Sequence, residues 1–182
     1  TRQPDWPPWI PPSPGIRTWE TAYTYTATVF TEALGAVHNG RTTNLAFQVF
    51  GTPWMRGEPV CEWLNAARLP GVVFYPHRFL PGSGPLANRS LDGVRIFVAQ
   101  PDTFRPVTTA VHIIACLQTL YGRKRVWNPA ETRMDFFDKL FGTDTVRKQL
   151  QAGVSPARIA AGWEKDIRAF GVTRKKCLLY ET

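Results

Sequence analysis

The sequence predicts a mixed α/β (α+β) domain in which helices pack on one small sheet, preceded by an extended arm. Three observations support this fold class. Short apolar runs typical of strands occupy the first half of the chain, helical spacing dominates the second half, and the first 22 residues are rich in proline and tryptophan. The length of 182 residues and the 43% hydrophobic content suit one domain with its own core, here residues 23–182.

The arm comprises residues 1–22. Its prolines favour an extended polyproline conformation, because each one fixes φ and lacks a backbone donor. The same segment holds Trp6, Trp9 and Trp19, whereas disordered segments are usually poor in aromatic residues. We therefore predict that these tryptophans form a contact surface for the domain itself, for an N-terminal domain outside this sequence or for a protein partner.

The predicted strands follow the arm. Residues 23–30 alternate Tyr, Ala or Val with Thr, and this period of two favours a strand. Residues 46–50, 72–75 and 94–99 are short apolar runs that predict further strands. Residues 81–92, rich in Gly, Pro, Ser and Asn, predict a loop.

Helix signals follow the strands and continue to the end of the chain. Predicted helices begin at Gly57-Glu58-Pro59, at Pro106, at Asp135, at Thr143 and at Ser155-Pro156. Proline at a first helical position and serine just before it are typical start signals. Along the last helix, the buried stripe is predicted to comprise Ile159, Trp163, Ile167 and Phe170.

The charge of the chain is +8 and unevenly distributed, with +6 carried by residues 123–182. A basic half can face an acidic protein, a glycan or anionic lipid, or can simply be a solvated surface. The clusters Arg123-Lys124-Arg125 and Arg174-Lys175-Lys176 contain no aromatic residue on which a base could stack, which disfavours nucleic acid. No apolar run approaches the roughly 18 residues of a transmembrane segment, so none is predicted.

The cysteines and histidines do not predict a metal site. Cys61, Cys116 and Cys177 form no C-x-x-C motif, and no H-x-x-x-H spacing occurs. All three thiols lie in or beside apolar helical patterns and are predicted to be buried. His112 is predicted to face the surface of its helix. No G-x-G-x-x-G motif is present, and no cofactor is expected.

Residues 32–54, EALGAVHNGRTTNLAFQVFGTPW, are the most informative segment. They resemble a signature of the bacterial exo-β-N-acetylmuramidase family. The shared residues are Glu32, Gly40, Arg41, Thr43, Phe47, Gly51, Pro53 and Trp54. Further similarity runs in family order through Trp9-Ile10-Pro11-Pro12, Leu69-Pro70-Gly71-Val72, Phe104-Arg105-Pro106-Val107 and Leu178-Leu179-Tyr180. The resemblance therefore covers nearly the whole chain.

The resemblance implies an extracytoplasmic protein of peptidoglycan turnover that contacts a muramic-acid glycan. The chain departs from the family pattern at Asn39, where the family has a second Glu, at His38, where it has Ser, and at Thr42, where it has Gly. Complete members resemble a Rossmann-like half followed by this smaller domain, and the chain contains no counterpart of that half. Two hypotheses follow. The favoured one is a non-catalytic accessory or binding module, and the other is the C-terminal half of an active exo-muramidase.

Glu32 is the candidate catalytic residue, because glycosidases use carboxyl groups and Asn39 cannot transfer a proton. The alternative is a structural carboxylate that accepts hydrogen bonds from the backbone or Arg41. Arg41, Asn39 and His38 are candidates for substrate binding, since the guanidinium fork matches the lactyl carboxylate of muramic acid. The alternative for Arg41 is an ion pair with Glu32 or Asp92.

Overall fold

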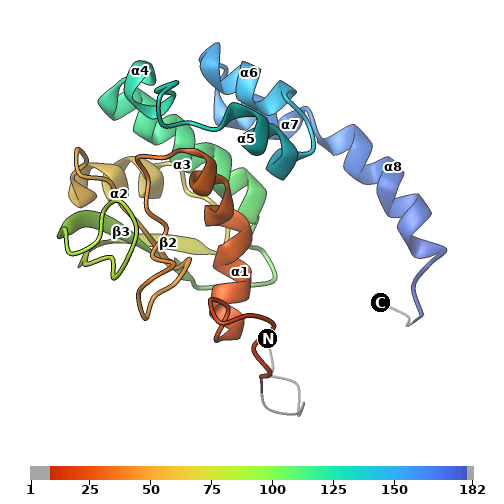
Figure 1. Cartoon of the computed structure of the whole chain (residues 1–182). Helices are drawn as coiled ribbons and strands as arrows, with labels where there is room; N and C mark the ends of the chain where they lie inside the picture. Colours follow the sequence, from red (N-terminus) through yellow and green to blue (C-terminus); the bar gives the residue numbers. More distant parts are fainter. Residues whose placement is uncertain (1–8, 180–182) are drawn as a thin grey trace.

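The computed structural model describes residues 9–179, so Trp6 of the predicted contact surface lies outside the described residues. Figure 1 shows helices gathered around a small sheet, with the last helix extending away from them. In chain order the elements are α1 (Trp19–Thr28), the 3-10 helix η1 (Val29–Ala33), β1 (Val49–Phe50), α2 (Gly57–Ala66), β2 (Val72–Phe79), β3 (Leu91–Val98), α3 (Pro106–Tyr121), α4 (Arg123–Val126), α5 (Met134–Phe141), α6 (Thr145–Gln151), α7 (Pro156–Ala161) and α8 (Glu164–Lys175). The predicted mixed α/β class is confirmed.

The sheet is antiparallel, with strand order β1-β3-β2. Phe74 and Ile96 are paired across β2 and β3, and both are almost completely buried beneath α2. On the opposite face, Tyr75 and Phe97 are 51% and 49% exposed. The sheet therefore has one covered and one solvent-facing side, as expected of a small antiparallel sheet.

Helix α3 forms the centre of the helical layer. It contacts α1, α2, α4, α6 and α7, and all nine residues from Thr109 to Leu117 are buried. The surface position predicted for His112 is therefore wrong, because a helix covered on several sides has no polar face for a residue outside its main stripe. The Nδ1 atom of His112 lies 2.8 Å from the carbonyl oxygen of Thr108, and burial lowers the pKa of the imidazole.

The strand predicted for residues 23–30 is wrong, since this segment belongs to α1 and η1. Thr18 caps the helix by accepting from the backbone N–H of Thr21. The small buried side chains of Thr21, Thr24, Ala27 and Thr28 fall on one helical face and let α1 approach α3. The hydroxyl of Thr24 bonds to the carbonyl of Glu20, so this threonine is satisfied within the helix.

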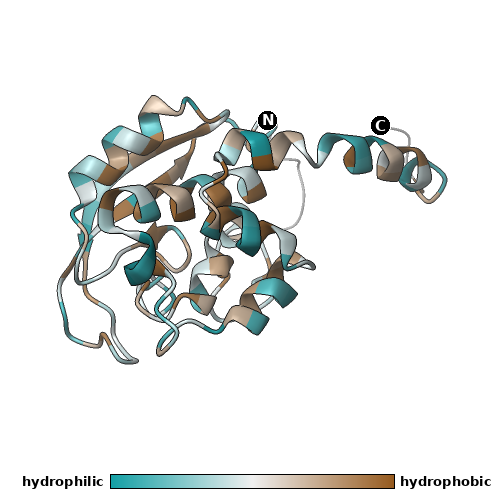
Figure 2. Ribbon diagram, turned by 90° about the horizontal axis from the view of Figure 1, so that it is seen from above, coloured by the Kyte–Doolittle hydropathy of each residue, from teal (hydrophilic) through white to brown (hydrophobic). Residues whose placement is uncertain are grey.

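The predicted last helix is divided in two. Ser155 caps α7 as expected, but that helix ends at Ala161, and α8 begins at Glu164. Ile159 is buried and Trp163 is partly buried against the core, whereas Ile167 and Phe170 are 62% and 66% exposed. The buried stripe predicted along this segment is therefore correct only in its first half. Figure 2 shows α8 extending away from the other helices.

The remaining predictions of helices, strands and buried cysteines are also confirmed in part. The predicted helix starts near Gly57, Pro106 and Asp135 are confirmed, and the short strand at 46–50 is reduced to β1. Cys61 and Cys116 are buried thiols as predicted, and burial raises the pKa of each to about 12. Cys177 is exposed, contrary to the prediction, because α8 buries no residue. Across residues 9–179, no helix is both long and apolar enough to cross a membrane.

An aromatic cluster joins α5 to the core, and it gives a test of the fold. Phe137 is fully buried, with its ring centroid 5.1 Å from that of Trp127 and 4.8 Å from that of Phe141. We expect Phe137→Ala to lower the free energy of unfolding by about 3–5 kcal/mol, because it opens a cavity that neighbouring rings cannot fill. Urea denaturation measures this. The partly exposed neighbour is the control, and Phe136→Ala should cost less than half as much.

Candidate functional site

The signature segment forms a loop that is closed at its base by a pair of backbone hydrogen bonds. His38 N–H donates to the Gly51 carbonyl at 2.8 Å, and Gly51 N–H donates to the His38 carbonyl at 2.9 Å. Between these residues the chain turns at Gly40, whose φ of 71° is in the left-handed region. A side chain at Gly40 would also collide with Val49 and the Leu45 carbonyl. The loop geometry therefore requires glycine at this turn.

Phe47 fixes the far side of the loop in the core. It is only 1% exposed, and its φ of 62° is unusual for a residue with a large side chain. Its N–H donates to the Asn39 carbonyl at 2.8 Å, and its carbonyl accepts from the Thr28 hydroxyl at 3.0 Å. The ring meets Tyr25 edge to face, with centroids 4.8 Å apart. These contacts hold the loop against α1.

Glu32, Asn39 and Arg41 come together on this framework. Glu32 Oε1 accepts from Asn39 Nδ2 at 3.3 Å and lies 3.3 Å from Arg41 Nη1. Asn39 is buried, the Glu32 side chain is 19% exposed, and the Arg41 side chain is 61% exposed. The guanidinium also lies over the ring of Phe47, 5.6 Å from its centroid. The cluster therefore presents one fixed cation to solvent above a half-buried carboxylate.

The ion-pair alternative for Arg41 is thus realised with Glu32. The resolved contact leaves other guanidinium donors available, since the guanidinium carries five N–H groups. His38 lies outside this cluster. Its Nδ1 accepts from the N–H of Gly40 at 3.0 Å, which places the ring proton on Nε2, and its ring lies beside Phe79. His38 therefore supports the turn.

The described part of the predicted arm turns at residues 13–16, and its end, from Trp19 on, is the first turn of α1. Trp9 and Trp19 are 41% and 36% exposed, and Trp19 packs edge to face on Tyr23. Trp9 Nε1 donates to the Ile16 carbonyl at 3.4 Å, and Gly15 lies against the ring of Phe47. The arm thus contacts its own domain while leaving aromatic surface exposed. Its role as an interface stays a prediction.

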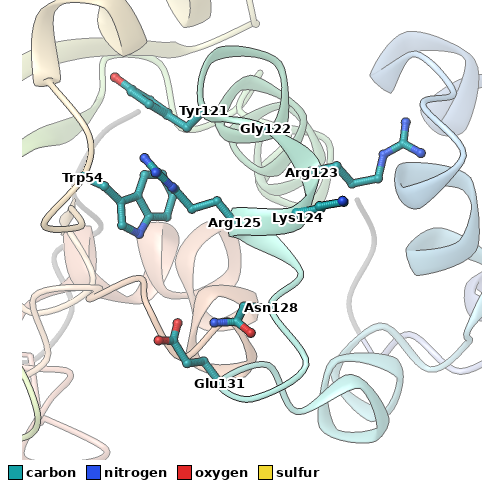
Figure 3. Close-up of a pocket in the computed structure, with 8 residues that line it drawn as sticks. All are labelled: Trp54, Tyr121, Gly122, Arg123, Lys124, Arg125, Asn128 and Glu131. Atoms are coloured by element: carbon teal, nitrogen blue, oxygen red, sulfur yellow. The ribbon is translucent and has the colours of Figure 1, made fainter.

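A pocket of about 640 Å³ lies where the last residue of the signature segment, Trp54, meets the end of α3 (Figure 3). The rings of Trp54 and Tyr121 are 5.4 Å apart, and Arg125 lies over the indole at 5.7 Å. Asn128 and Glu131 line the opposite wall, whereas the side chains of Arg123 and Lys124 point away from Trp54. An aromatic platform beside a few convergent polar groups is typical of a ligand pocket.

Most of this pocket was not predicted from the sequence. Tyr121 ends α3, Arg125 lies in α4, and Asn128 and Glu131 lie in the loop that follows. The available signals were Trp54, which ends the signature segment, and the basic cluster Arg123-Lys124-Arg125. The pocket also adjoins the Glu32 cluster through the backbone. Arg133 Nη2 donates to the Glu32 carbonyl at 3.0 Å, and Leu34 pairs with Thr132 in an isolated bridge.

A metal centre is not evident in the described part of the chain, where no group of three or more His, Cys, Asp or Glu side chains is placed to hold an ion.

Known proteins share both the sequence pattern and the fold of this chain. Residues 23–180 match the model for "Exo-beta-N-acetylmuramidase NamZ, C-terminal". The peptidoglycan beta-N-acetylmuramidase NamZ of Bacillus subtilis is 31% identical over 173 residues, which are 95% of this chain and 41% of that protein. The crystal structure of a DUF1343 family protein from Bacteroides fragilis has the same fold, with a TM-score of 0.87 and 24% identity, covering 95% of this chain and 45% of the other. The chain thus spans less than half the length of these relatives.

The hydrogen bond at His38 leads us to predict how the stability of the fold depends on pH. Burial lowers the pKa of His38 below its ordinary value of 6.5, and Nδ1 accepts a hydrogen bond only when the ring is neutral. The unfolded chain therefore binds this proton more tightly, so His38 stabilises the fold above about pH 6.5, and that contribution is lost as pH falls. In His38→Asn the amide oxygen can accept from Gly40 without titrating.

We expect urea unfolding between pH 7.5 and 5 to show a shallower loss of stability in His38→Asn than in the native chain. The difference is up to about 1.4 kcal/mol for each unit that separates the folded and unfolded pKa values. Burial also lowers the pKa of His77 and of His112, so both proteins should retain a common residual slope. Identical slopes would contradict the role of His38.

Proposed function

Because the chain belongs to the family of C-terminal domains of the exo-β-N-acetylmuramidase NamZ, we propose that it is a muramic-acid-binding accessory module of peptidoglycan turnover that does not cleave glycan alone. The proposal rests on the contacts that the Glu32 carboxylate makes. Its Oε1 atom is engaged by Asn39 and Arg41. A general acid must hold a proton for the leaving group, whereas this carboxylate acts as an acceptor.

Asn39, the neighbour of Glu32, supports a binding role for this cluster. A hydrolase that uses two carboxyl groups needs them about 5–10 Å apart on either side of the scissile bond. Asn39 is the direct partner of Glu32 here, and an amide can neither donate a proton as an acid nor accept one as a base. It can only orient the carboxylate. The pair therefore positions Arg41.

Arg41 is the group that we propose to meet the glycan. It is exposed, it is fixed on one side by Glu32, and the ring of Phe47 lies beneath it. A cation held in this way loses little side-chain freedom on binding. Muramic acid differs from glucosamine by a lactyl ether that ends in a carboxylate, and a guanidinium pairs with a carboxylate in two-pronged geometry.

The pocket at Trp54 supplies a second contact of suitable chemistry. The aromatic faces of Trp54 and Tyr121 offer apolar surface to a sugar ring, while Asn128, Glu131 and Arg125 can bond to its polar substituents. We propose that the Glu32 cluster and this pocket contact different sugars of a glycan strand.

A companion domain is part of the proposal. The chain covers 41% of the Bacillus relative and 45% of the Bacteroides one, so both contain much additional structure. The exposed aromatic surface of Trp9 and Trp19 suits contact with such a domain, or with a protein partner. A second candidate function follows from the same coverage, in which the chain is the C-terminal half of an active exo-β-N-acetylmuramidase.

Arg41→Met tests glycan binding. We expect the variant to bind an N-acetylmuramic acid glycoside about 10- to 100-fold more weakly than the native chain, because a hydrogen bond to a charged group contributes about 1.5–3 kcal/mol. The matching N-acetylglucosamine glycoside lacks the lactyl carboxylate, and its affinity should not change. Isothermal titration calorimetry measures both ligands. Arg89→Met, at another exposed arginine, is the control. Equal losses for both sugars would argue against lactyl recognition.

The two candidate functions differ in hydrolysis. We expect the purified chain to release no chromophore from a chromogenic β-N-acetylmuraminide at any pH between 4 and 8, because Glu32 is committed to Arg41 and Asn39. Hydrolysis by the native chain that disappears in Glu32→Gln, with thermal stability retained, would instead support the second candidate. The carboxamide keeps the acceptor oxygen but cannot serve as an acid or a nucleophile.

A further inference from the structure

Helix α8 differs from every other described helix in burying none of its residues. In Figures 1 and 2 it extends away from the body of the domain, beyond α7. A 12-residue helix alone in water is marginal, because helical stability in proteins comes mostly from packing of an apolar face. The side chains of α8 therefore need to be considered as a possible contact surface for another domain or protein.

An apolar stripe runs along α8 from the core outward. Trp163, Ile167 and Phe170 are spaced four and three residues apart, so they lie on one face of the helix. Trp163 packs partly against the hydrophobic core, and Ile167 and Phe170 continue its line at 62% and 66% exposure. Large apolar side chains that continue a core into solvent mark an interaction surface.

The charges on α8 are also uneven. Its last turn and C-cap carry Arg174, Lys175 and Lys176, and none of these is in an ion pair within residues 9–179. Near the start of the helix, Glu164 pairs with Arg168. A surface that fits this helix would be apolar opposite Ile167 and Phe170 and acidic opposite the last turn.

The longer relatives supply a candidate for what covers this face. The match to the Bacteroides structure covers 95% of the chain, which leaves about nine residues unmatched, fewer than the twelve of α8. At least part of α8 thus has a counterpart at the same position in that fold. More than half of that protein lies outside the match. Because the matching family model is that of a C-terminal domain, the remainder of such relatives precedes it.

We infer that the Ile167–Phe170 face of α8 is a docking surface for the companion domain that the longer relatives carry ahead of the matched region. This inference rests on the companion domain of the proposed function, but not on glycan binding. The stripe extends the core into the second domain, and the basic last turn meets an acidic margin of that domain. Residues of α8 then gain the burial that they lack in this chain.

The test uses the full chain and, as the probe, the purified segment of the Bacillus subtilis relative that precedes its matched region. We expect the two to associate in calorimetry and to elute together. Ile167→Glu combined with Phe170→Glu should weaken the association at least 10-fold, because two charges would enter an apolar contact. The matched control is Val172→Glu. This residue is 65% exposed on the same helix, roughly opposite the stripe, and should have no effect.

The outcomes separate the possibilities. Failure of the native chain to bind the segment, or equal weakening by Val172→Glu, would overturn the inference. Self-association of the native chain that the double variant abolishes would also overturn it, by assigning the face to a second copy. Binding of the muramic acid glycoside should be the same in all three proteins. A loss of segment binding with glycan binding intact therefore concerns α8 alone.

Discussion

The anchoring of Phe47 is the constraint on which the signature loop depends. A buried phenylalanine in the left-handed region costs roughly 1–3 kcal/mol of backbone strain, and only surrounding contacts can sustain it. Here the Thr28 hydroxyl, the ring of Tyr25 and the Asn39 carbonyl supply those contacts. Because Asn39 is bonded to Phe47 through its backbone and to Glu32 through its side chain, the strained residue and the charged cluster share one framework.

Asn39 also determines the electrostatics of that framework. A second carboxylate beside Glu32, as the resemblance to the muramidase signature implies for other members, would place two like charges in contact and raise the pKa of one of them. An amide at this position donates to Glu32 instead. Glu32 can then hold Arg41 without competition. Asn39 and Glu32 thus form a pair that can orient a cation.

The sequence predicted the parts of the structure that local signals control. Proline at the start of α3 and serine before α7 predicted helix starts, because capping depends on neighbouring residues. Residues 23–30 were predicted as a strand, because alternating threonines have β propensity. They are helical because their small side chains allow α1 to pack closely on α3, and this packing cannot be predicted from the local sequence. The ion pair of Glu32 and Arg41 was one of the alternatives that the sequence offered. The pocket residues Asn128 and Glu131 meet Trp54 only through the tertiary fold.

The distribution of burial separates the elements that fold the domain from those that are free to bind. Helix α3 is buried along nine consecutive residues and contacts most of the other helices, so the core is complete without α8. A helix that contributes nothing to the core can carry Ile167 and Phe170 in solvent without weakening the fold. Ile167 and Phe170 are therefore free to serve the contact that we propose between α8 and the companion domain.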